Sequence, residues 1–176
     1  MRSHRSMLGI TFACLWLLPG AAGAESNTQT VQVSATILPR LELSVAPETG
    51  SSIAFGALTQ PADGDAASRS VNVSLNVFSN LGRPYHVTQT IRQPLTNAQG
   101  RMIPPEQLQV TTRSAVHGTP GAANPVALIP GVPMTLYTSD AGGTSAEFSA
   151  DYALKVTPTT PTGTFQTEIL YTVTSL

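Results

Sequence analysis

Residues 71–77 read Val-Asn-Val-Ser-Leu-Asn-Val, with an apolar side chain at every second position. This two-residue period is typical of a β-strand with one buried face. A turn-forming stretch follows at residues 79–84, and apolar and polar residues alternate again at 85–91. We therefore expect two strands here, joined as a β-hairpin.

The same period recurs along the chain. Long alternating stretches lie at residues 31–37, 41–45, 148–156 and 165–173, and shorter apolar stretches lie at 53–56, 108–112, 126–129 and 134–137. Several short strands at such spacings predict an all-β, immunoglobulin-like Greek-key β-sandwich. A closed up-and-down barrel is the alternative, although the long connections rich in Gly and Pro favour Greek-key crossovers.

The composition supports strands and excludes some partners. Only 11% of the 176 residues are charged, and the chain has 23 Thr but a single Lys. Thr favours strands, whereas the helix formers Glu and Lys are scarce. The net charge of -1 and the lack of any Lys/Arg run predict no binding to nucleic acid, whose recognition begins with a basic patch.

The first 24 residues have the three parts of a secretory signal peptide. Arg2 and Arg5 are followed by an apolar stretch at 7–18 and by small residues at 19–24. A membrane anchor, the alternative, needs about 20 apolar residues. We therefore expect residues 1–24 to be removed on export, leaving an N-terminal extension at 25–39 and a β-sandwich domain at 40–176. Cleavage would also remove Cys14, the only cysteine.

No group of residues indicates catalysis. His86 and His117, the two histidines outside the signal peptide, stand at no metal-ligand spacing. The sequence contains no G-x-S-x-G elbow, no Walker A loop and no dinucleotide-binding glycine motif. We expect a protein that is not an enzyme and that uses no cofactor, metal or small-molecule substrate.

Both ends of the predicted domain resemble a known family. Residues 30–39 read Thr-Val-Gln-Val-Ser-Ala-Thr-Ile-Leu-Pro and precede Leu-Glu-Leu at 41–43, while Pro-Thr-Gly-Thr-Phe at 161–165 precedes Tyr-Thr-Val-Thr at 171–174. In these features the chain resembles subunits of chaperone-usher pili, most of all the cysteine-free major pilins of the alternate, colonisation-factor type. Residues 53–56 also resemble the spore-coat-U-like pilins, which usually carry cysteines that this chain lacks.

The resemblance implies a structural fimbrial subunit that is assembled by donor-strand exchange. In that family, the segment before the proline fills a groove in the neighbouring subunit, whose immunoglobulin-like fold lacks one strand. The implied donor side chains are Val31, Val33, Ala35 and Ile37, and those lining the groove on the C-terminal strand are Phe165, Ile169, Tyr171 and Val173. The implied partners are neighbouring subunits, a periplasmic chaperone and an outer-membrane usher. The implied location is the periplasm, then the cell surface, with a role in adhesion.

An alternative gives residues 31–38 a different role. They could form the first strand of a self-complete sandwich, in a secreted surface or binding protein that does not polymerise. A cell-wall-attached surface domain is a further alternative, since a final strand after Pro-x-Gly is common to several such families.

Overall fold

The computed structural model describes residues 31–62, 66–113 and 115–176. The predicted signal peptide at 1–24 and the first residues of the predicted extension lie outside the described residues. The chain divides into two units, Met1–Thr36 and Ile37–Leu176, and all the assigned strands lie in the second.

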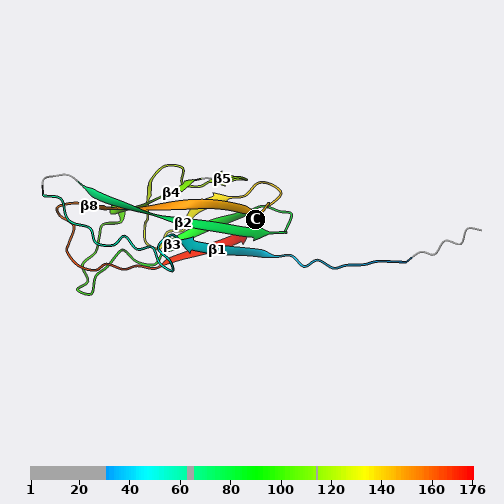
Figure 1. Cartoon of the computed structure of the whole chain (residues 1–176), viewed down its shortest axis with the longest axis horizontal. Coiled ribbons are helices and arrows are strands. Elements are labelled where there is room, and N and C mark those ends of the chain that lie inside the picture. Colours follow the sequence, from blue (N-terminus) through cyan, green and yellow to red (C-terminus); the bar gives the residue numbers. More distant parts are fainter. Residues whose placement is uncertain (1–30, 63–65, 114) are drawn as a thin grey trace, which may run out of the picture. The chain divides into compact units, whose positions relative to one another are not determined.

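The second unit is nearly all β-structure and forms two antiparallel sheets (Figure 1). The first sheet has the order β1 (Leu41–Pro47), β2 (Ala67–Ser79), β8 (Ala146–Val156), β4 (Leu108–Arg113) and β6 (Val126–Ala127). The second has the order β5 (Thr119–Pro120), β7 (Met134–Thr138), β3 (Tyr85–Ile91) and β9 (Ile169–Ser175). The helical element within the described residues is a short 3-10 helix, η1 (Pro105–Gln107). The all-β prediction is confirmed, as two sheets.

The hydrophobic core lies between the two sheets and is built by the alternation seen in the sequence. Val73, Leu75 and Val77 of β2 are fully buried, as are Tyr85 and Val87 of β3. The rings of Tyr137 and Phe148 stack with their centroids 4.7 Å apart. Each fully buried Val or Leu side chain stabilises the fold by roughly 1.5–3 kcal/mol. Burial of alternate side chains therefore fixes which face of each strand points inward.

The predicted hairpin between residues 71–77 and 85–91 is wrong. Both strands form, but β2 pairs with β1 and β8, whereas β3 pairs with β7 and β9 in the other sheet. The turn between them crosses from one sheet to the other. An alternating pattern shows only that one face of each strand packs on the core. Two strands joined across the core, one in each sheet, satisfy this as well as a hairpin does.

Two other predicted strands differ in the structure. Residues 53–56 take part in no ladder and therefore form no strand. Ile53 and Phe55 nevertheless pack on the core. The last strand, predicted at 165–173, begins only at Ile169, and Phe165 packs on the core from the preceding loop. The strands predicted at 108–112, 126–129, 134–137 and 148–156 are present as β4, a two-residue β6, β7 and β8.

Residues 31–40 are assigned to no strand. Their large apolar side chains are exposed, with Val31 at 81%, Val33 at 91% and Ile37 at 84% of their accessible surface. Isolated apolar side chains are common on protein surfaces, but a row of them at every second position is not explained by the fold of this chain alone.

Candidate functional site

The edge strands of the two sheets lie together on one side of the sandwich. β1 is the outermost strand of the first sheet, β9 is the outermost strand of the second, and the two are in contact. Within the described residues, β1 pairs only with β2, and β9 pairs only with β3. Each therefore presents one edge of its backbone without a ladder partner, which is a template for an added strand.

The ladder shows which backbone groups face the open edge of β9. The amide of Leu176 donates to Pro84 (2.8 Å) and the amide of Arg92 donates to Glu168 (3.1 Å), so the even-numbered residues of β9 bond to β3. Bonded residues alternate along an antiparallel strand, which leaves the N–H and C=O groups of the odd-numbered residues on the open edge. These are the residues whose side chains point toward the core: Ile169, Tyr171, Val173 and Ser175.

The ladder between β1 and β2 likewise shows which backbone groups of β1 face its open edge. The amides of Asn80 and Glu48 donate to Arg40 (3.2 Å) and Asn72 (3.0 Å), so the odd-numbered residues of β1 face the open edge. Pro47 is one of them, and its lack of an N–H costs the fold no ladder bond there. The open edges of β1 and β9 thus flank the same side of the core.

The core is less covered along this side than elsewhere. The inward side chains are buried from Val71 to Val77 in β2, and throughout β3 and β8. The inward side chains of β1 and β9 are only half-buried, although they pack on the same core: Leu41, Leu43, Val45, Ile169, Tyr171 and Val173. The apolar interior therefore reaches the surface between these two strands.

A groove of ≈ 1150 Å³ opens at this side, and most of its lining comes from the segments 51–60 and 160–167. Its walls include Val45 and Pro47 from the second half of β1 and Ile169 and Tyr171 from the first half of β9. Core side chains lie beneath, namely Leu108, Tyr152, Leu154 and Val156. Because the residues along it are mainly apolar, the groove suits a segment with apolar side chains on one face.

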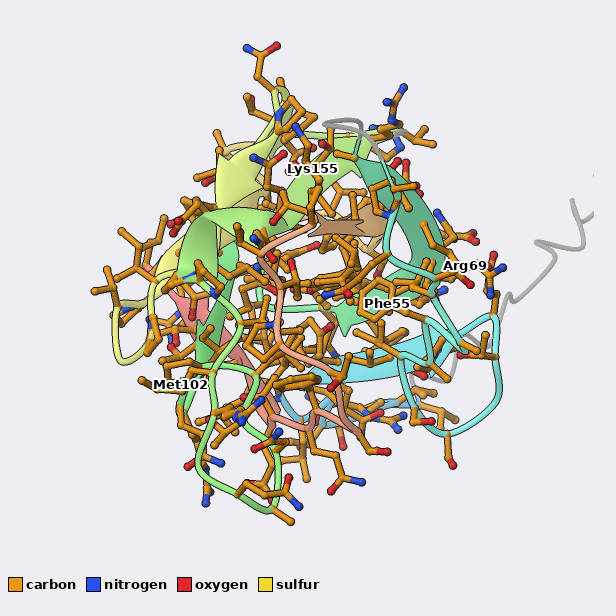
Figure 2. All side chains as sticks on the ribbon, turned by 90° about the vertical axis from the view of Figure 1, so that its left-hand side faces the viewer. Phe55, Arg69, Met102 and Lys155 are labelled. Atoms are coloured by element: carbon orange, nitrogen blue, oxygen red, sulfur yellow. The ribbon has the colours of Figure 1, made fainter. Side chains whose placement is uncertain are left out.

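The segment 51–58 forms a further wall of the groove. Ile53, Phe55 and Leu58 pack on the core from it, half-buried. Side chains hold the segment: the guanidinium of Arg69 donates to the carbonyl of Phe55 (2.9 Å), and the amide of Ala54 donates to Thr49 Oγ1 (3.3 Å). Arg69 and Phe55 are labelled near each other in Figure 2. A segment that is held without a backbone ladder can move at lower cost than a strand.

A buried polar chain runs under the groove. The hydroxyl of Tyr171 donates to that of Tyr152 (2.8 Å), which donates to Gln89 Oε1. Tyr152 and Gln89 are 0% and 1% exposed. A buried polar group without a partner costs roughly 1–3 kcal/mol. The hydrogen bonds among these three side chains avoid that cost. The only half-buried member is Tyr171, at the groove itself.

The phenol of Tyr171 provides a titration test of the groove. Burial raises its pKa from 10.0 to about 12. Because the pKa is higher in the folded than in the unfolded chain, the stability from this group is complete below about pH 10 and is lost as the pH rises through about 12. We expect absorbance titration of the native protein to show a phenolate step near pH 12 that is missing in Tyr171→Phe, and an occupied groove to raise this step further. A Tyr171-dependent step near pH 10 would contradict the described burial.

The family resemblance implied four residues lining the groove. Three of them, Phe165, Ile169 and Tyr171, do line it. Val173 packs on the core further along β9 and is not among the lining residues. The expected donor residues Val31, Val33 and Ala35 belong to the first unit and Ile37 to the second, and all four are exposed.

The floor of the groove and the hydrogen-bonded side chains Tyr171, Tyr152 and Gln89 were not predicted from the sequence. Gln89 occupies an inward position in the alternation of residues 85–91, between Val87 and Ile91. A polar residue at such a position signals a buried hydrogen-bond partner, so it could have been noticed. Its pairing with Tyr152, which lies 63 residues further along the chain, could not.

No protein-family model matches the chain, and no curated protein matches it. Across residues 31–62, 66–113 and 115–176, no cluster of three or more His, Cys, Asp or Glu side chains could hold a metal ion. In the same ranges, no helix has the length and hydropathy of a membrane span.

Proposed function

We propose that this chain is a structural subunit of a fimbria or pilus-like fibre, and that residues 31–37 of one copy add a strand to the groove of the next. The observation that carries the proposal is the open, mainly apolar groove beside the edge strands β1 and β9, together with an exposed segment of the same chain in which apolar residues alternate with polar ones. In β-strand addition, the backbone supplies the affinity and alternate side chains fill the pockets. The proposed role is structural and not enzymatic.

The strand order supports an immunoglobulin-like fold in which, among the described residues, no strand occupies the outer side of β9. An immunoglobulin sandwich has one sheet in the order A-B-E-D and another containing C, F and G. The order β1-β2-β8-β4 corresponds to A-B-E-D, and the neighbours β3 and β9 correspond to C and F. Strand G would lie beside F, and the open edge of β9 is the corresponding position. We propose that a donor strand takes it.

The donor segment and the open edge are compatible in length and pattern. Residues 31–37 and strand β9 both comprise seven residues, about 23 Å when extended. An antiparallel donor would place its inward side chains opposite Ile169, Tyr171 and Val173, whose backbone groups face the open edge. Val31, Val33, Ala35 and Ile37 would then face the core, and the polar residues between them would face solvent.

The proposed partners follow from the exposed groove. A subunit with an open apolar groove and an unpaired edge is prone to aggregate until the groove is filled. We propose that a periplasmic chaperone covers it first, that an outer-membrane usher exchanges the chaperone for the next subunit, and that the fibre is displayed on the cell surface. Export through the signal peptide and a role in adhesion are part of the same proposal.

A truncated chain tests the proposal. Residues 38–176 retain the groove but lack the donor, so they should cap a growing fibre at one end and form none themselves. We expect the chain of residues 25–176 to form head-to-tail oligomers, which sedimentation and electron microscopy would detect, and the truncated chain to shorten them in proportion to its amount. Oligomers whose length is unaffected by the truncated chain would contradict donor-strand exchange.

The self-complete alternative also has an observation in its favour. Ile53, Phe55 and Leu58 cover part of the core at the groove from within the same chain. If this cover were sufficient, residues 25–176 would be a stable monomer at all concentrations. The same sedimentation experiment therefore separates a polymerising subunit from a self-complete surface or binding protein.

A further inference from the structure

Asn80 holds the chain where it enters β1. Its side-chain Oδ1 accepts the amide of Arg40 (2.6 Å), and its Nδ2 donates to the carbonyl of Leu38 (3.0 Å). Its backbone amide also donates to the carbonyl of Arg40 (3.2 Å). One residue therefore bonds to the chain on both sides of Pro39.

These bonds extend the β1–β2 ladder beyond the last assigned pair. That pair is Leu41 with Ser79, so Arg40 and Asn80 are the next residues in register. In a regular ladder, the Arg40 amide would bond to the main-chain carbonyl of its partner. Here the side-chain carbonyl of Asn80 accepts it instead, which brings the amide group of the same side chain within reach of Leu38.

The side chain of Arg40 adds two contacts at the same place. Its guanidinium lies 5.2 Å from the centroid of the Phe78 ring and pairs with the carboxylate of Glu42. A cation over an exposed aromatic ring contributes roughly 0.5–1 kcal/mol. The entry to β1 is thus fastened through both the backbone and the side chain of Arg40.

We infer that Asn80 is a positioning residue for assembly: it holds residues 38–40 rigidly against the sandwich, so that no free linker remains between a subunit and its donor segment. The inference rests on the proposed function. With residues 31–37 in the neighbour and residues 38–40 fixed by Asn80, successive subunits are joined without a flexible hinge. Asn80 thereby sets the stiffness of the fibre and not the affinity of the groove.

Three variants test this role. Asn80→Ala removes both side-chain bonds, whereas Asn80→Asp keeps the acceptor for the Arg40 amide and loses the donor to Leu38. Asn76→Ala, on the exposed outer face of β2, is the matched control. Backbone order parameters of Leu38 and Arg40 measure the clamp directly, by NMR on residues 25–176 with a second copy of residues 25–38 added after Leu176, which fills the groove and keeps the chain monomeric.

We expect order parameters of about 0.85 in the wild type and in Asn76→Ala, values below about 0.6 in Asn80→Ala and intermediate values in Asn80→Asp. The melting temperature should change little, and Asn80→Ala fibres should lose bending stiffness in electron micrographs. Unchanged order parameters in Asn80→Ala would overturn the clamp, and unchanged stiffness of its fibres would overturn the role in assembly. A wild type that forms no fibres would contradict the proposed function. The order parameters would still show whether Asn80 holds residues 38–40.

Discussion

Moving residues 25–38 from the N-terminus to a position after Leu176, through a short turn, is expected to raise the free energy of unfolding by about 3 kcal/mol. A strand that follows β9 through a turn lies antiparallel to it, which is the orientation proposed for the donor. Burial of Val31, Val33 and Ile37 contributes roughly 1.5–3 kcal/mol for each side chain, and part of this is offset by the ordering of the segment. The rearranged chain should also be monomeric.

Thermal unfolding followed by circular dichroism measures this gain. For a domain of this size, about 3 kcal/mol corresponds to a rise of roughly 6–12 °C in the melting temperature. The matched control carries a Gly/Ser tail of the same length after Leu176, which lacks the apolar side chains and should leave the melting temperature unchanged. A parent chain that unfolds cooperatively as a monomer and gains nothing from the rearrangement would refute the polymer proposal.

Val33→Asp is expected to abolish assembly, whereas Ser34→Asp should leave it nearly unchanged. The two residues are adjacent, but in a strand their side chains point to opposite faces, so only the carboxylate introduced at position 33 would enter the groove. Burial of a carboxylate in an apolar site without a partner is strongly unfavourable. A loss of roughly 3 kcal/mol weakens binding by more than 100-fold.

Synthetic peptides separate this effect from misfolding. Peptides of residues 25–39 with the wild-type sequence, Val33→Asp or Ser34→Asp would be titrated into the truncated chain 38–176, with binding followed by calorimetry. The Val33→Asp change should also leave a chain folded when its own groove is filled by a wild-type tail after Leu176. Equal affinities of the two variant peptides would show that residue 33 does not enter the groove.

The alternating residues predicted most of the strands because burial of one face imposes a two-residue period. The long strands β2 and β8 were evident for this reason. Alternation does not reveal which sheet a strand joins, so it wrongly predicts a hairpin after β2, where the turn crosses between the sheets. It also does not require a ladder, as Ile53 and Phe55 show by packing on the core outside any strand.

Only the parts of the candidate site near the two ends of the chain were predictable from the sequence. The strand containing Ile169 and Tyr171 was visible in the sequence, and its role at a groove followed from a family resemblance. The groove itself forms where the edge strands of two different sheets, β1 and β9, lie together and the loops 51–60 and 160–167 meet them, which is a property of topology. The clamp of Asn80 on Arg40 and Leu38 joins residues 40 and 42 positions apart, so it has no local signal in the sequence.

The most direct measurement is a pair of single cysteines, because Cys14 is the only cysteine in the sequence and lies in the predicted signal peptide. One chain carries Ser34→Cys, and the other carries Leu170→Cys, Thr172→Cys or Thr174→Cys, on the exposed face of β9. These positions do not bond toward the open edge, so an antiparallel donor brings one of them close enough to Ser34 for a disulfide.

We expect that mixing two single-cysteine chains under oxidising conditions gives a disulfide-linked heterodimer in one of the three pairings. The corresponding double variant should give a ladder of linked chains on non-reducing electrophoresis. A double variant that closes its disulfide within one chain would show that the segment completes its own sandwich. No specific cross-link in any of the three pairings would show that residues 31–37 do not add to β9. Either result would contradict donor-strand exchange.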